Sequence, residues 1–137
     1  MVYMISIDQL SLPRQLDIVF RELDEELTGL DSGIVFVQIR NNVIGKFGIR
    51  HYPVPMKKEM DSSLKGLTDS QRSSFRLMAI ESLKLKKHWT HGEITYDFAI
   101  RNGMIVVDST LESNYNLASL MIRYPRNTYT DVHVGPS

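Results

Sequence analysis

The sequence predicts an α+β domain with two layers, in which an antiparallel sheet of at least four strands has helices packed on one face. Two β-hairpin patterns indicate this class, because residues 93–112 turn at Asn102-Gly103 and residues 34–50 turn at Asn41-Asn42. A helical pattern precedes each hairpin and a third follows the second hairpin, so the expected order is αββαββα. Hairpins joined in one sheet, with helices on its apolar side, satisfy such an order.

Length and composition are those of one globular domain spanning residues 1–137. Hydrophobic residues at 42% and charged residues at 23% argue against disorder and against a membrane protein. The 16 basic residues balance the 16 acidic ones, which argues against a dedicated nucleic-acid binder. Zero net charge also predicts either limited solubility or self-association near neutral pH, the latter as a homo-oligomer. The absence of cysteine excludes disulfides and zinc-thiolate sites, and it suits a reducing cytoplasm.

The start of the chain carries no charged n-region, and no apolar run approaches the roughly 18 residues of a membrane span, so neither export nor membrane insertion is expected. Residues 2–7 are apolar and favour either an edge strand or a lead-in that packs on the first helix. That helix is expected over about 13–27, with Ser11 as N-cap, Pro13 in its first turn and Gly29 following at C′. Its apolar residues recur at helical spacing: Leu12, Leu16, Val19, Phe20, Leu23 and Leu27.

The 34–50 hairpin is apolar on both faces, which predicts central strands covered on both sides. A regular two-residue turn places Phe36 opposite Phe47 and Ile39 opposite Ile44. Two glycines of the second strand suit a bulge or the close approach of another segment: Gly45 and Gly48.

A long connection with at most one helical turn is expected over residues 56–67. Thr68 and Gln71 then form a capping box that begins a helix over about 69–87. Its expected apolar stripe comprises Phe75, Met78, Ala79, Ser82 and Leu85. A short third helix is expected from Ser113 or Asn114 to Tyr124, before Pro125. Beyond it, residues 128–134 favour either an added edge strand or a frayed end.

The 93–112 hairpin has one apolar face and one acidic face. Its turn sets a register in which the apolar face contributes these residues to the core: Ile94, Phe98, Ile100, Ile105 and Val107. On the other face Asp97 lies opposite Asp108, and Glu93 lies opposite Glu112. Like charges directly opposite on neighbouring strands are destabilising, so these four carboxylates are the place where the chain gives up stability.

The candidate binding residues are therefore Glu93, Asp97, Asp108 and Glu112, which we define as the acidic square. General acid/base work prefers a concave pocket, so an exposed cluster of carboxylates fits a basic protein surface better. Two alternatives remain open from the sequence. The square is a solvated face on which salt screens the repulsion, or Asp97 and Asp108 form an acid/base pair or a divalent-cation site.

No catalytic, phosphate-binding or metalloprotease motif occurs, so no catalytic residue, cofactor or metal is assigned. His88 and His91, followed by Glu93, offer a metal site only as the alternative of a small cytoplasmic enzyme or metal-dependent protein, since structural zinc usually takes four ligands. Trp89 is expected as an apolar plug between the second helix and the sheet. The lysines near residues 57–87 lack interleaved aromatic residues, so no nucleic-acid role is assigned to them.

Trp89-Thr90 directly after the second helix, with Ile105 and Asp108 in the acidic hairpin, resembles the YezG-like immunity proteins. The likeness covers element order and length over most of the chain. The sequence departs where the family has a tryptophan ending the first helix, here Thr28-Gly29, and a denser run of aspartates after the hairpin turn. The resemblance implies a non-catalytic bacterial antitoxin of the cytoplasm that neutralises a secreted toxin, often a nuclease, through acidic residues.

Overall fold

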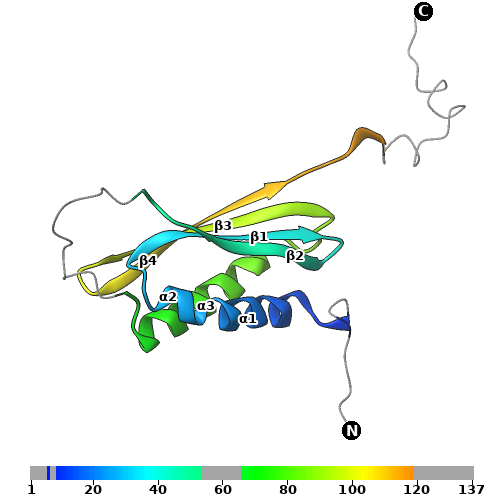
Figure 1. The fold of residues 1–137 in the computed structure, drawn as a ribbon. Helices are drawn as coiled ribbons and strands as arrows, with labels where there is room; N and C mark the ends of the chain where they lie inside the picture. Colours follow the sequence, from blue (N-terminus) through cyan, green and yellow to red (C-terminus); the bar gives the residue numbers. More distant parts are fainter. Residues whose placement is uncertain (1–5, 7–8, 54–65, 119–137) are drawn as a thin grey trace, which may run out of the picture.

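The computed structural model describes residue 6, residues 9–53 and residues 66–118. Its elements in chain order are α1 (Leu12–Glu22), α2 (Asp24–Leu27), β1 (Ser32–Arg40), β2 (Val43–Arg50), α3 (Asp69–Ser82), the 3₁₀ helix η2 (Leu83–Leu85), β3 (His91–Arg101) and β4 (Met104–Ser113). The strands form one antiparallel sheet in the order β2-β1-β3-β4, and α1 and α3 lie along one face of it (Figure 1). The predicted two-layer α+β class with a four-stranded antiparallel sheet is confirmed. Four predicted segments lie wholly or mostly outside the described residues: residues 2–7, the connection before residue 66, the expected third helix, and residues 128–134 with their alternatives of an edge strand or a frayed end.

The first helical region begins as predicted and is interrupted near its end. The Ser11 side chain accepts a hydrogen bond from the Arg14 amide, and Pro13 lies in the first turn. The helix breaks at Leu23 and resumes as α2, which Thr28 caps. Gly29 follows the cap, although its φ is not in the left-handed region that a glycine at C′ often adopts.

The second long helix, α3, begins at the predicted capping box, in which Thr68 and Gln71 bond each other's backbone amides. It ends at Ser82, and the chain continues as a 3₁₀ turn. The changed spacing turns Leu83 inward and leaves Leu85 72% exposed, so the predicted stripe is wrong for Leu85. It is also wrong for Met78, which is 39% exposed on the flank of α3.

The β1–β2 hairpin turns at Asn41 and Asn42, both with positive φ. Ile39 pairs with Ile44 as predicted, but the register shifts between Val37 and Ile39. Phe36 consequently lies opposite Gly48 and not opposite Phe47, so that predicted pair is wrong. The extra residue of this bulge lies on β2 between Ile44 and Phe47, a stretch that includes Gly45, one of the two glycines that suited a bulge or a close approach.

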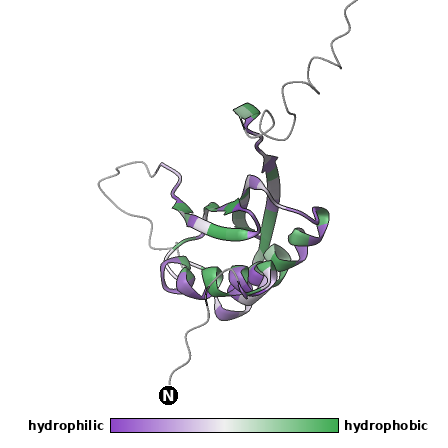
Figure 2. Ribbon diagram, turned by 90° about the vertical axis from the view of Figure 1, so that its right-hand side faces the viewer, coloured by the Kyte–Doolittle hydropathy of each residue, from purple (hydrophilic) through white to green (hydrophobic). Residues whose placement is uncertain are grey.

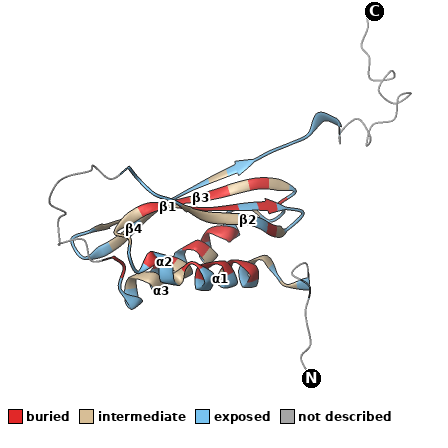
Figure 3. Ribbon diagram, in the orientation of Figure 1, coloured by how far each residue is buried: buried red, intermediate tan, exposed pale blue. Residues whose placement is uncertain are grey.

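The same strands differ from expectation in their position. Of these two strands only β1 is central, because β2 forms one edge of the sheet. Among the described residues, helices cover one face of the sheet alone (Figure 3). The prediction of two central strands covered on both sides is therefore wrong. Phe36, on the face without helices, is buried instead against Gly48, where an added Cβ would lie 3.0 Å from its ring.

The core lies between the sheet and the helices, and the helical layer also carries hydrophilic residues among its hydrophobic ones (Figure 2). Phe75 of α3 packs edge-on against Phe20, with 4.9 Å between ring centroids, and in a tilted arrangement against Phe98 at 5.0 Å. Ile94 and Phe98 of β3 are fully buried as predicted. The other three residues predicted for this core are only half-buried and pack against its rim: Ile100, Ile105 and Val107.

Two further buried side chains, Tyr96 and Trp89, contribute to this core. The Tyr96 hydroxyl lies 3.0 Å from Ser82 Oγ, and burial raises the pKa of Tyr96 to about 12. Trp89 is 1% exposed and covers Gly92, so its predicted role as a plug beside the sheet is consistent with its burial.

Candidate functional site

The open face of the sheet, opposite the helices, presents the acidic square in the register that the sequence predicts. Asp97 pairs with Asp108, and Glu93 pairs with Glu112, across an unbroken β3–β4 ladder. Thr95 and Thr110 lie between the two pairs. Since successive side chains alternate between faces, all four carboxylates project from the same side of this hairpin.

Residues of β2 and of the segment after it bind two carboxylates of the square, and one of the two contacts is an ion pair. Arg50 Nη2 donates to Glu93 Oε1 at 3.1 Å, and the Tyr52 hydroxyl donates to Asp97 Oδ1. That hydrogen bond is the largest cause of the raised pKa of Tyr52, followed by burial and the charge of Asp97. Neither partner is predicted from the sequence, because no local pattern indicates that β1 pairs with β3 and so brings β2 within reach of β3.

Arg50 reaches the acidic hairpin by crossing β1. Its guanidinium carbon lies 4.4 Å from the centroid of the Phe36 ring, and its terminal nitrogen continues to Glu93. A cation over an aromatic face is attracted by the ring quadrupole, so Phe36 supports the bridging position of Arg50. The sheet order β2-β1-β3 makes this contact feasible.

The β4 half of the square remains without such partners. Among the described residues no side chain forms an ion pair or a hydrogen bond with Asp108 or Glu112. Both residues are exposed. The structure thus divides the square into Glu93 and Asp97, which have partners, and Asp108 and Glu112, whose charge faces solvent.

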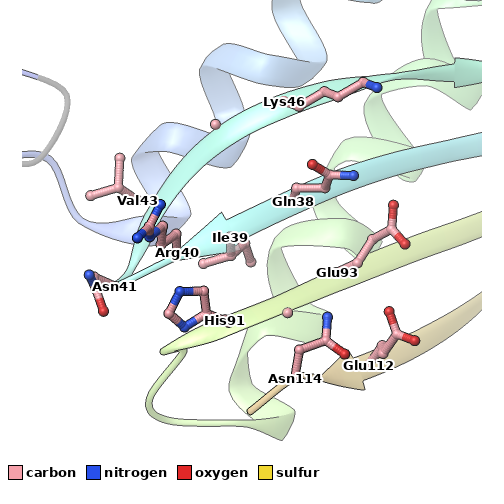
Figure 4. Close-up of a pocket in the computed structure, with 12 residues that line it drawn as sticks. Gln38, Ile39, Arg40, Asn41, Val43, Lys46, His91, Glu93, Glu112 and Asn114 are labelled. Carbon is pink, nitrogen blue, oxygen red and sulfur yellow. The ribbon is translucent and has the colours of Figure 1, made fainter. Parts of the chain in front are cut away.

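One end of the open face is hollowed into a depression of about 750 Å³, where the β1–β2 turn meets the start of β3 and the end of β4 (Figure 4). Arg40 and Lys46 lie on one side of it, and Glu93 and Glu112 lie on the other. His91 stands between the two sides. Opposite charges across a shallow depression suit a polar or charged side chain of a partner.

No metal site is found in the part of the chain that the structure describes, since no three or more His, Asp or Glu side chains there are arranged to hold an ion. His88 is exposed, and His91 lines the depression. The alternative of a metal-dependent protein using His88 and His91 therefore gains no geometric support.

Two of the lysines after α3 make side-chain contacts. Lys84 Nζ bonds Glu81 at 2.9 Å, and Lys86 Nζ donates to Ser113 Oγ at 2.6 Å while lying 5.2 Å from the Trp89 ring. The Lys84 contact is local, between residues three apart, whereas the Lys86 contact joins the segment after η2 to the end of β4.

Comparison of the chain with protein-family models, with curated proteins and with solved structures gave no match. No helix in the described ranges is both long and apolar enough to cross a membrane.

Proposed function

We propose that this protein is a non-catalytic interaction module that binds a basic protein through the acidic square. The observation that carries the proposal is the two like-charge cross-strand pairs, Asp97 with Asp108 and Glu93 with Glu112, on the sheet face that no described helix covers. A positive partner surface would relieve this repulsion. The carboxylates that lower the stability of the free protein would then contribute favourably to the free energy of binding.

The resemblance of the sequence to YezG-like immunity proteins supports a narrower version of the proposal. In that version the partner is a basic toxin of the nuclease type, and binding takes place in the bacterial cytoplasm. The gene next to the one encoding this chain is then the first place to look for the partner.

The sharpest test removes the charge of Asp108, one of the two carboxylates of the square without a partner among the described residues. Asp108→Asn relieves repulsion with Asp97 and leaves the Tyr52 hydrogen bond intact, so we expect it to raise the free energy of unfolding by up to about 1 kcal/mol. For a domain of this size that corresponds to a rise of a few degrees in melting temperature. Adding Asp97→Asn tests the whole pair, at the cost of weakening the Tyr52 contact.

Binding is measured by calorimetry at several salt concentrations, with the basic product of the neighbouring gene as ligand. Asp108→Asn should weaken binding and flatten its salt dependence, whereas Glu22→Gln, an exposed charge on α1, should change neither. A variant that is more stable but binds with unchanged affinity and salt response would show that the square is not the binding surface.

A further inference from the structure

The outer edge of β4 presents backbone groups that pair with no strand in the described part of the chain. A two-residue turn makes Arg101 and Met104 a hydrogen-bonded pair, and such pairs alternate along an antiparallel ladder. The amide of Asn114 accordingly donates to the His91 carbonyl at 2.8 Å. Even-numbered residues of β4 therefore bond β3, while the peptide groups of Ile105, Val107 and Ser109 point outward.

This edge lacks several of the protections that sheet proteins commonly use, although Asp108 and Glu112 place two charged side chains along it. Within the described residues no strand pairs with it, and β4 carries no proline, lysine or bulge along Met104–Ser113. The opposite edge, β2, has a bulge and two cations, Lys46 and Arg50. A long, regular, unpaired edge is a template for another strand.

A groove with an apolar wall lies at the turn end of the same edge. It has a volume of about 510 Å³ between α3 and the start of β4. Leu77 is 62% exposed and Met104 is 70% exposed along it, with Met78 beside them. Large apolar side chains exposed together in this way mark an interaction surface.

The two sides of the edge differ in character. Ile105 and Val107 point to the helix side, next to the groove, whereas Asp108 and Glu112 point to the open face. A strand added beside β4 would place alternate side chains in these two environments. Apolar side chains suit the first environment, and basic ones suit the second.

We propose that β4 accepts an extended segment of the partner as a fifth strand, in which basic residues alternate with apolar ones. The inference rests on the proposed function and adds the form of the ligand to it. A second copy of this chain fits less well, because two adjoining β4 strands bring the carboxylates of Asp108 and Glu112 from both copies onto one face. Main-chain hydrogen bonds supply affinity in such complexes, and alternate side chains supply specificity.

The test uses two synthetic peptides of equal length and charge. Fluorescence anisotropy measures the affinity of this protein for each peptide. Lysine and valine alternate in the first peptide and are grouped in separate blocks in the second. The alternating peptide should bind about tenfold more tightly, because only its pattern matches both sides of the edge. In the complex, hydrogen exchange at the Val107 and Ser109 amides should slow, while the amide of Thr110, already bonded to β3, should change little.

Ser109→Pro removes an outward amide without removing a bond to β3, so it should weaken the alternating peptide about tenfold and leave the fold intact. Ser109→Ala, which keeps the amide, is the matched control and should bind like the native chain. Leu77→Ser is an independent variant on an exposed helix position, and it should also weaken binding of the alternating peptide.

The outcomes separate this inference from the proposed function. Equal binding of both peptides, weakened by Asp108→Asn but not by Ser109→Pro, would overturn strand addition while supporting the acidic binding face. Preference for the alternating peptide, lost in Ser109→Pro but unaffected by Asp108→Asn, would support strand addition and count against the acidic face. A dimer of the native chain that Ser109→Pro dissociates would overturn the partner strand in favour of a second copy.

Discussion

The two hairpins of the sheet share a turn geometry and differ in everything that follows it. Asn41 and Asn42 have φ of 51° and 61°, and Asn102 and Gly103 have φ of 52° and 75°. The β3–β4 ladder then continues without interruption, whereas the β1–β2 ladder shifts by a bulge. A turn therefore determines only the nearest pairs, and the packing of the strands decides whether the register continues.

The bulge and the regular ladder produce opposite surfaces. The shift puts Gly48 opposite Phe36, so the ring has room beneath the guanidinium of Arg50. Carboxylate faces carboxylate along the regular ladder, and the β4 edge stays straight and open. The bulge thus makes the β2 edge irregular, whereas the β4 edge is regular.

The largest change in stability is expected at Gly92, where β3 packs closely against Trp89. A Cβ at Gly92 would lie 2.3 Å from the Glu112 carbonyl oxygen and 2.6 Å from the Trp89 ring, so Gly92→Ala should cost about 3 kcal/mol of stability. Gly45 of β2 has no described heavy atom within 4 Å of such a Cβ. Gly45→Ala should therefore be neutral or stabilise by about 0.5 kcal/mol. Urea denaturation compares the two, and equal stabilities would contradict the packing described for Gly92.

A smaller effect is expected at alkaline pH, where Tyr96 in the core contrasts with Tyr52 on the open face. Burial raises the pKa of Tyr96 from 10.0 to about 12, so the unfolded chain loses this proton first. The stability from the neutral buried hydroxyl is complete below pH 10 and is lost as the pH rises to about 12, by about 2 kcal/mol.

Tyr96→Phe should remove that part of the alkaline decline, at a cost of about 1 kcal/mol at neutral pH from its lost hydrogen bonds. Tyr52→Phe should leave the decline nearly unchanged, because Tyr52 is exposed. Urea melts between pH 8 and about pH 12 measure both variants. An unchanged alkaline slope in Tyr96→Phe would show that another group causes the decline.

The smallest expected changes in stability come from exchanging the residue types at the second position of the two hairpin turns, Asn42 and Gly103. The Asn42 side chain accepts a hydrogen bond from the Trp89 amide at 2.9 Å, so Asn42→Gly should cost about 1 kcal/mol although glycine suits the turn. Gly103 has open space around it, and Gly103→Asn should cost only about 0.5 kcal/mol. Thermal melting measures both variants. A stabilised Asn42→Gly would show that turn preference outweighs the contact with Trp89.

The parts of the fold that the sequence predicts correctly depend on neighbours in the chain. Asn102-Gly103 determines a tight turn, and alternation along the flanking strands determines which side chains share a face. The opposition of Asp97 and Asp108 follows from these two rules alone. Thr68 and Gln71 likewise begin α3 through bonds between residues three apart.

The sequence by itself thus determined both turns, the caps at the starts of α1 and α3, and the carboxylate pairs of the acidic square. Only the tertiary structure decided that β1 lies beside β3, that Arg50 and Tyr52 partner Glu93 and Asp97, and that β4 is the edge of the described sheet opposite β2. Strand order depends on how the helices and both hairpins pack together, and no local rule contains that information. Two carboxylates of the square consequently have partners more than forty positions away, through the Arg50–Glu93 ion pair and the hydrogen bond from Tyr52 to Asp97.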